Sequence, residues 1–340
     1  MQYYTSIPKP CQESTQIEIP DREQLLLDTE KRKIISNALS EAYNDLGRQR
    51  KADYVSHCSD FLTIGTNAEG KSKVVKAYRC RDRLCPICQK VKAGNTYAIL
   101  KQAIESSDHG QYHYIFLTLT IKNIDGDILR EALSGMLKAY DSMKKTAKFS
   151  RAISGSVRSL EITYNQEKQY HPHIHVILQV KKRYFLRSDK FYITHDQYLA
   201  MWKKALSKYT NLESDIVDIR KTKKEDIIPE LCKYVAKSQD YIDLENPTES
   251  MSRIGILATA LHGIRFLGMS GNIKKQPISK EQKKESIKEY NLNLAVYQFN
   301  RINQKYIPHH TRNKETRYTG QIQEKDKKSN QMQHYKKEMS

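Results

Sequence analysis

The chain has 340 residues, with 58 Lys or Arg against 39 Asp or Glu, and its formal net charge is +19. This positive excess excludes an acidic, calcium-buffering protein. It favours a polyanionic partner, because each phosphate that a cation neutralises releases condensed counterions. No run approaches the ~18 consecutive apolar residues that a membrane-spanning helix needs, and the N-terminus has no apolar signal core. We therefore expect a cytoplasmic protein that binds nucleic acid and no membrane.

The first 53 residues are expected to form an arm and one long helix. Residues 1–20 are polar and contain three prolines, which favours a loose arm. Apolar residues then recur at helical spacing from Asp21 to Leu46, and Asp21 can cap the helix while Gly47 can end it. Such an amphipathic helix is more often used for packing than for chemistry.

Cysteines dominate the next segment, residues 54–95. Two of them form the tight turn CPIC, whose thiolates converge on one point and suit a tetrahedral Zn²⁺. We predict a zinc-binding module with one structural zinc, and His57 is an alternative to the cysteine beside it as fourth ligand. A redox CxxC pair is the competing interpretation, disfavoured because no βαβ pattern surrounds the turn. Cys11 and Cys232 are expected to be plain thiols. The predicted zinc ligands are Cys58, Cys80, Cys85 and Cys88.

Strand and helix patterns alternate over residues 96–275. A polar stretch, NQEKQYHP, joins two of the strands as a hairpin. The pattern predicts an α+β fold, in which helices cover a central antiparallel sheet. A C-terminal helix is expected over 276–300. A basic tail follows over 301–340, with ten Lys or Arg against four acidic residues, and is expected to be disordered. Strands are predicted over 112–121, 156–164, 173–180, 215–219 and 264–269, and helices over 93–106, 126–148, 194–208 and 226–240.

Two histidines, His173 and His175, alternate within the apolar strand HIHVIL. Because side chains along a strand alternate between faces, both imidazoles point to one face and could share a divalent cation. His171 is in phase with them and could also participate. Glu161 supplies a carboxylate if its strand pairs across the hairpin, and burying that carboxylate without a cation would be costly. A purely structural histidine pair is the alternative.

A third pattern lies in the segment PELCKYVAKSQDYI. Glu230, Tyr234, Lys237 and Tyr241 follow one another at spacings of four, three and four, so they share one face of the predicted helix. Glu and Lys beside a Tyr are also common on a solvated helix surface, so this spacing alone does not establish catalysis.

Together these motifs resemble the replication initiators of rolling-circle plasmids, in the single-tyrosine group of the HUH endonuclease superfamily. The resemblance is carried by FLTLT (116–120), SLEITYN ahead of HIH (173–175), and ELCKYVAK (230–237). It covers roughly residues 54–270 and includes the C-x₄-CPxC element, which is similar to the zinc-binding segment of that group. It implies the RRM-like HUH endonuclease fold for residues 96–275.

The resemblance also implies roles for single residues. His173 and His175 correspond to metal ligands. With Glu161 as the carboxylate that the hairpin would place beside them, mixed imidazole and carboxylate ligation suits Mn²⁺ or Mg²⁺. Tyr234 corresponds to the nucleophile of the Y-x-x-K motif and Lys237 to its lysine. Glu230 is expected to act as general base in termination, whereas Tyr241 is the alternative as a second attacking tyrosine.

The implied protein nicks a plasmid double-strand origin through a tyrosine–DNA 5′-phosphodiester, frees a 3′-OH for rolling-circle replication and rejoins the strands at termination. Its DNA would be single-stranded at the nick and double-stranded at the recognition site, with a host helicase and DNA polymerase as partners. A relaxase or single-strand transposase shares the same motifs and is one alternative. A non-catalytic, zinc-containing DNA-binding regulator is the other.

Overall fold

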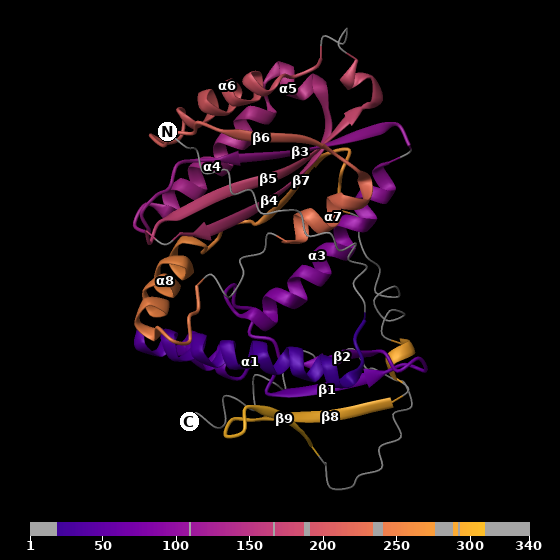
Figure 1. Cartoon of the computed structure of the whole chain (residues 1–340), viewed down its shortest axis with the longest axis vertical. Helices are drawn as coiled ribbons and strands as arrows, with labels where there is room; N and C mark the ends of the chain where they lie inside the picture. The colour runs from indigo at the N-terminus through magenta and orange to yellow at the C-terminus, as the bar shows by residue number, and fades with distance from the viewer. Residues whose placement is uncertain are drawn as a thin grey trace, which may run out of the picture. The chain divides into compact units, whose positions relative to one another are not determined.

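Two antiparallel sheets and the helices around them make up the structure (Figure 1). It is a computed structural model that describes residues 19–108, 110–165, 167–186, 191–233, 241–275, 288–291 and 293–309. The N-terminal elements are α1 (Arg22–Asp45), α2 (Gln49–Ser56), β1 (Phe61–Thr66), β2 (Ser72–Ala77) and α3 (Pro86–Ser107). The central elements are β3 (Tyr112–Thr120), α4 (Leu129–Lys144), α5 (Ala147–Ala152), β4 (Ile153–Tyr164), β5 (Tyr170–Lys181), η1 (Lys182–Phe185), α6 (His195–Leu206), β6 (Val217–Thr222) and α7 (Lys224–Lys233). The last are α8 (Pro247–Ala260), β7 (Leu267–Gly271), η3 (Glu289–Asn291), β8 (Asn293–Asn300) and β9 (Lys305–Pro308).

The larger sheet has five strands in the order β6-β3-β5-β4-β7, and every neighbouring pair is antiparallel. Its centre is the hairpin of β4 and β5, which pair from Ile153↔Val180 to Tyr164↔Tyr170. This confirms the predicted α+β class and the predicted hairpin, because the polar stretch between the two apolar strands does form their connection.

Helices cover both faces of this sheet. On one face, even-numbered residues of β5 such as Ile174 and Val176 join a large core that also contains buried residues of α4, α6 and α8. On the other face, Ile177 packs with Phe116, with Leu100 of α3 and with apolar residues of α7. His173 and His175 are odd-numbered like Ile177, so they lie on the face that α3 and α7 cover.

The smaller sheet, in the order β2-β1-β8-β9, corrects two predictions. Residues 293–300 form strand β8 instead of the last part of a C-terminal helix, and 305–308 of the expected disordered tail form strand β9. The reason is a period of two: Tyr297 and Phe299 point inward beside Leu62 and Ile64, while the residues between them face outward. The predicted boundaries at residues 53, 95 and 275 stay predictions.

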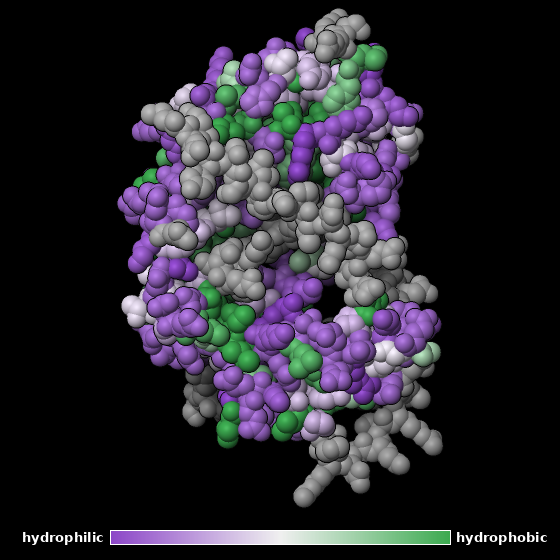
Figure 2. All heavy atoms as spheres, viewed as in Figure 1, coloured by the Kyte–Doolittle hydropathy of each residue, from purple (hydrophilic) through white to green (hydrophobic). Residues whose placement is uncertain are grey.

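The first helix begins as the sequence predicts. The Asp21 carboxylate accepts a hydrogen bond from the amide of Gln24 at 2.9 Å, which caps α1. The Gln24 side chain donates forward to Asp28, so the reciprocal half of a capping box is not made. Among the described helices, none is both long enough and apolar enough to cross a bilayer. Hydrophilic side chains cover most of the coloured surface in Figure 2, in keeping with the high charge of the chain.

Candidate functional site

Four cysteines meet in one cluster beside α1, and two of them, Cys58 and Cys85, are buried. The Sγ–Sγ distances are 3.7 Å from Cys58 to Cys88, 3.6 Å from Cys80 to Cys88 and 3.7 Å from Cys85 to Cys58. A disulfide would need about 2.05 Å. Tetrahedral ligation with metal–sulfur bonds of about 2.3 Å places the sulfurs about 3.8 Å apart, so the donor set fits a tetrahedral metal ion.

Three local features bring these thiols together. Cys58 follows the end of α2, and Cys85 and Cys88 lie at the start of α3, with Pro86 in its first turn. Arg81 adopts a left-handed backbone conformation with φ of 60°, and its amide donates to the Cys88 sulfur at 3.3 Å. The CPIC turn therefore does open a helix, contrary to the prediction that started this helix at residue 93. The convergence of four thiols, however, favours a metal over a redox pair.

Cys58, and not His57, is the fourth member of the cluster. Within the described ranges these four cysteines are the one group of three or more His, Cys, Asp or Glu residues whose ligand atoms all lie within 4.8 Å of one another. The exposed His57 ring instead contacts the carbonyl oxygen of Asp53 at 2.8 Å and the hydroxyl of Ser56 at 3.0 Å.

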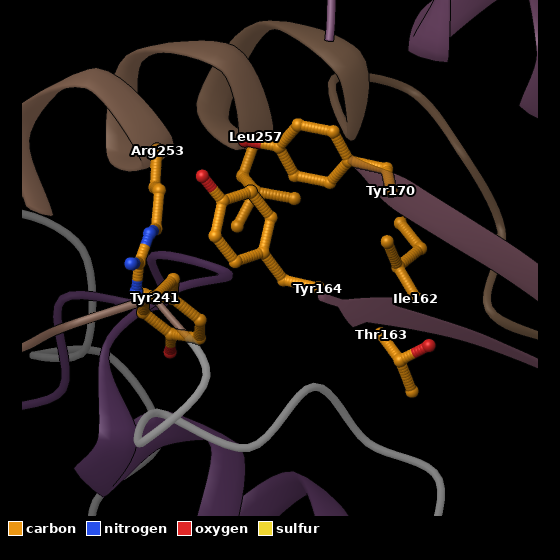
Figure 3. A pocket seen from close by; sticks show the side chains of 7 residues that line it. All are labelled: Ile162, Thr163, Tyr164, Tyr170, Tyr241, Arg253 and Leu257. Atoms are coloured by element: carbon orange, nitrogen blue, oxygen red, sulfur yellow. The ribbon is translucent and has the colours of Figure 1, made fainter. Parts of the chain in front are cut away.

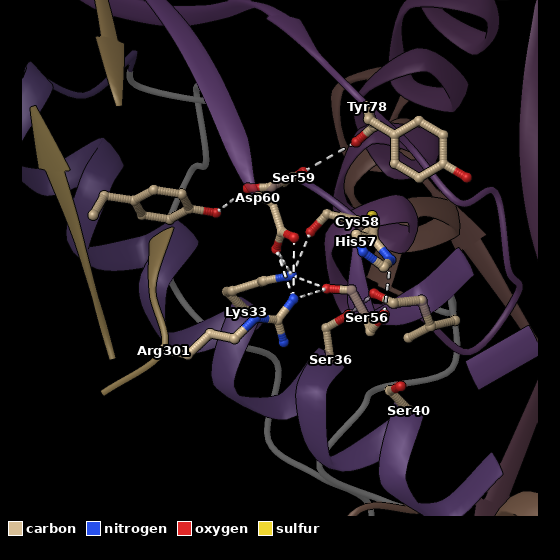
Figure 4. Close-up of polar contacts among 12 residues, drawn as sticks. Lys33, Ser36, Ser40, Ser56, His57, Cys58, Ser59, Asp60, Tyr78 and Arg301 are labelled. Carbon is tan, nitrogen blue, oxygen red and sulfur yellow. Dashed lines mark hydrogen bonds and ion pairs between the residues drawn. The ribbon is translucent and has the colours of Figure 1, made fainter. Parts of the chain in front are cut away.

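A buried lysine supports the Cys58 end of the cluster, and sequence patterns gave no signal for it (Figure 4). Lys33 is fully buried, and its ammonium donates to the carbonyls of Ser56 and Cys58 at 2.5 and 3.0 Å and to Asp60 at 2.6 Å. Arg301 donates to the same Ser56 carbonyl and to Asp60, each at 3.0 Å. Burial lowers the pKa of Lys33, but a buried cation with three acceptors is a satisfied one. The backbone at Cys58 is thus fixed from α1 and from the β8–β9 turn.

The histidine strand lies next to the predicted carboxylate. Glu161 of β4 pairs with His173 of β5 in the sheet register. Its carboxylate reaches diagonally to His175, with 2.8 Å between Oε2 and Nε2. The imidazoles of His173 and His175 stack with ring centroids 5.7 Å apart and an interplanar angle of 15°, as expected for neighbours on one face.

Thr118 adds a contact that the sequence did not reveal by itself. It belongs to the FLTLT motif and pairs with His175 in the register, and its hydroxyl oxygen lies 3.2 Å from Nδ1 of that histidine. Pairing the FLTLT strand with the HIH strand would have identified it, because directly paired residues lie on the same face of a sheet. Because Thr118 contacts one ring nitrogen and Glu161 the other, the orientation of the His175 ring is fixed.

Glu161, His173 and His175 are donor types that a divalent cation uses, but their ligand atoms do not all lie within 4.8 Å of one another, so joint ligation would need a side chain to rotate. The contact between Nε2 of His175 and the Glu161 carboxylate needs a proton or a cation between the two atoms, and adjacent ligands of a metal with bonds of about 2.1 Å are themselves about 3 Å apart. Nδ1 of His173 is buried without a hydrogen-bond partner. Burial, with smaller effects of His171 and His175, lowers the pKa of His173 to about 3, so this ring is neutral and can act as a ligand at pH 7.

Helix α7, which contains the start of the third motif, packs on the same face. Its buried residues Ile227 and Leu231 share a core with Phe116 and Ile177, and the Phe116 ring lies 5.5 Å from the ring of His175. The described part of the helix ends at Lys233. The predicted nucleophile Tyr234 and its partner Lys237 lie outside the described residues. Glu230 lies in α7, but its side chain is outside the described part.

Tyr241 is placed elsewhere. Its side chain is buried, and its hydroxyl donates to the carbonyl of Leu84 at 2.6 Å. Figure 3 shows it near Arg253, in a small pocket that α8 and the β4–β5 hairpin line. Tyr241 belongs to the core that contains Ile174 and Val176 of β5, so it is associated with the opposite face of the sheet from the histidines.

Comparison with known proteins assigns a family to this arrangement. A family described as "Replication protein" matches residues 71–319. The chain belongs to this replication protein family. It is 31% identical to a "Protein rep" of Streptococcus pneumoniae over 276 residues, 75% of this chain and 83% of the relative.

Two further relatives carry the same name. A "Protein rep" of Bacillus amyloliquefaciens is 30% identical over 272 residues, 71% of this chain and 78% of the relative. One of Staphylococcus aureus is 30% identical over 199 residues, 57% of this chain and 85% of the relative. No solved structure matches the chain significantly. The family match includes β3, β4 and β5, the three strands that carry Thr118, Glu161 and the histidines, and so a role in replication, with DNA as the partner, applies to this part of the chain.

Proposed function

We propose that the chain initiates rolling-circle replication of a plasmid by nicking its double-strand origin through Tyr234. One observation carries this proposal: Glu161, His173 and His175 lie on one face of the sheet, and α7, which continues in sequence to Tyr234, packs on that same face. A DNA-binding protein without catalytic activity has no need for this arrangement.

The reaction is a transesterification. The Tyr234 oxygen attacks the phosphorus of the scissile phosphodiester, a bond forms between them, and the bond from phosphorus to the 3′-oxygen breaks. The phenol loses its proton and the departing 3′-oxygen gains one, which gives a 5′-phosphotyrosyl protein and a free 3′-OH. Because one phosphodiester replaces another, the linkage can later be exchanged back to join the strands.

The residues of the chain prepare both partners. A phenol with a pKa near ~10 is a weak nucleophile at pH 7, so the ammonium of Lys237 would favour the phenolate. Glu161, His173 and His175 would hold Mn²⁺ or Mg²⁺, which when bound supplies Lewis-acid stabilisation of charge on the scissile phosphate. The burial of His175 and its contact with Thr118 keep the site rigid for in-line attack.

Termination is assigned to Glu230. It lies one helical turn before Tyr234, where it could act as general base for water. The alternative, Tyr241, has its hydroxyl buried and bonded to the Leu84 carbonyl, which speaks against attack on DNA by this residue.

The cysteine cluster is proposed to hold one structural Zn²⁺. Four thiolates leave a zinc ion no open position for substrate, so this metal would stabilise the fold and take no part in catalysis.

After nicking, a host helicase would unwind the strands and a host DNA polymerase would extend the 3′-OH.

A covalent adduct tests the proposal. Full-length protein is incubated with Mn²⁺ and a single-stranded origin oligonucleotide that is labelled at its 5′ end in one reaction and at its 3′ end in another. We expect a labelled protein band that survives denaturation only in the reaction with the 3′ label. Tyr234→Phe should abolish the adduct, and Tyr241→Phe should leave it. An adduct that survives Tyr234→Phe would refute the assignment, and an absence of nicking by the wild type would favour the non-catalytic alternative. A relaxase or transposase would instead act on DNA unrelated to a replication origin.

A further inference from the structure

Two cations converge on one aromatic ring near the start of α3. The guanidinium carbon of Arg83 lies 5.5 Å from the centroid of the Phe266 ring, and Nζ of Lys92 lies 4.8 Å from the same centroid. Both cationic side chains are also exposed to solvent. The negative face of a ring attracts each cation, but two cations that share one ring still repel each other.

No carboxylate compensates the charge of this pair. Within the described ranges, neither Arg83 nor Lys92 forms an ion pair with an acidic side chain. Asp82, the one acidic residue among positions 81–104, is paired with Lys51 at 3.2 Å instead. Burial, followed by the charge of Arg83, lowers the pKa of Lys92. An anion bound at the two cations would offset their repulsion.

Arg83 is held in place before any ligand binds. Its guanidinium donates to the carbonyl oxygen of Ile264, and its own carbonyl oxygen accepts a hydrogen bond from the Gln89 side chain at 2.8 Å. In the sequence, Arg83 lies between two cysteines of the cluster, and Lys92 follows a third by one helical turn. The fold around the cysteine cluster therefore positions both cations, and a preformed pair loses little conformational freedom on binding.

The pair lies next to strand β4, which carries the predicted carboxylate. The amide of Leu160 donates to the carbonyl oxygen of Phe266 at 3.0 Å, and Leu160 directly precedes Glu161. Arg265, the neighbour of Phe266 in the sequence, adds a third exposed cation. DNA that reaches Glu161 and the histidines would therefore pass close to these cations.

We propose that Arg83 and Lys92 bind backbone phosphates of the DNA on which the protein acts. DNA presents one such anion per nucleotide, and Arg and Lys are side chains that bind phosphate in protein–DNA complexes. Phosphate contacts fix the position of the DNA and carry no sequence information. The inference rests on the proposed function for the identity of this DNA as origin DNA, but binding at these cations needs neither Tyr234 nor a catalytic metal.

Fluorescence anisotropy with labelled origin DNA tests this proposal. Full-length Tyr234→Phe protein, which should not nick, is titrated onto an origin duplex and onto one of its strands at several salt concentrations. In this background, Arg83→Ala, Lys92→Ala should reduce the magnitude of the slope of log K against log salt by about 1.8 for the duplex, or by about 1.4 for the single strand, since each phosphate contact contributes about 0.9 or 0.7. A smaller slope for the duplex places the cations on the recognition site, and a smaller slope for the single strand alone places them at the nick.

Phosphate binding also predicts how the DNA sequence affects the loss. The double variant should lose affinity by the same factor for origin DNA and for a scrambled sequence, because phosphate contacts do not read bases. An unchanged salt slope on both forms of DNA would overturn the proposal, and so would a loss confined to the origin sequence.

Matched variants separate phosphate binding from folding. Lys92→Gln leaves the contact of Arg83 with Ile264 intact and should produce half of the change in slope. Lys92→Arg keeps the charge and should bind like the wild type, whereas a loss as large as that of Lys92→Gln would show a packing role and contradict the proposal. Lys138→Ala, Lys204→Ala removes two exposed lysines from α4 and α6 and should leave the slope as it is.

The adduct assay is read separately from these slopes. Wild-type protein that shows the expected salt dependence but forms no adduct with origin DNA would refute nicking by Tyr234 and leave the phosphate site standing.

Discussion

At the scale of single residues, the histidine strand depends on side chains that no one motif contains. His175 is held from both ring nitrogens, by Thr118 at 3.2 Å and by Glu161 at 2.8 Å, and these two residues come from strands on either side of β5. The HIH motif predicts only that two imidazoles share a face. The Glu161 partner follows from the predicted hairpin, whereas the Thr118 partner depends on the pairing of β3 with β5, which the sequence does not specify.

Thr118→Val tests the contribution of this contact. The variant keeps the shape of the side chain and removes the hydroxyl that orients His175, so we expect the Mn²⁺ concentration for half-maximal adduct formation to rise about 10- to 100-fold. Thr222→Val, at the far end of β6, is the matched control and should leave the metal dependence as it is. If Thr118→Val had a wild-type metal dependence, Thr118 would merely fill space in the sheet.

At the scale of elements, predictions were sound where a pattern repeats locally. The apolar run of β3 and the β4–β5 hairpin have the predicted type and nearly the predicted bounds. The start of α3 was placed too late because Pro86 and the cysteines mask its helical pattern, although proline suits a first turn. The prediction of a helix at β8 overlooked the two-residue alternation of Tyr297 and Phe299, and the partner strand β1 lies more than two hundred residues away in sequence, so the pairing itself could not be read locally.

Cys85→Ser tests whether the four cysteines hold a structural zinc ion. We expect wild-type protein to contain about one equivalent of zinc by atomic absorption and the variant much less. The free energy of unfolding should fall by several kcal/mol, since structural zinc contributes on the order of 10 kcal/mol of apparent binding free energy in small zinc modules. Cys11→Ser, at a cysteine that the sequence predicts to be a plain thiol, should match the wild type in both measurements. Zinc-free wild-type protein, purified without chelators, would contradict the prediction.

At the scale of the whole molecule, the two ends of the described chain depend on each other. Strands β8 and β9 complete the sheet that β1 and β2 begin, and Arg301 in their turn donates to Asp60 and to the Ser56 carbonyl, two residues before Cys58. Lys33 joins the same group from α1. We therefore expect the cysteine cluster to depend on residues near position 300, because they contact the backbone next to its first cysteine.

Truncation separates this view from an autonomous zinc module. A chain that ends at residue 292 loses Tyr297, Phe299 and Tyr306, all buried in the small sheet and each contributing on the order of 1.5–3 kcal/mol. We expect its unfolding midpoint in urea to fall and its zinc to be released faster to a chromogenic chelator. A chain that ends at Pro308 keeps β9 and the Arg301 contacts, so it should hold zinc like the full-length protein. Equal zinc release from the two truncated chains would mean that the cluster is stable without the C-terminal strands.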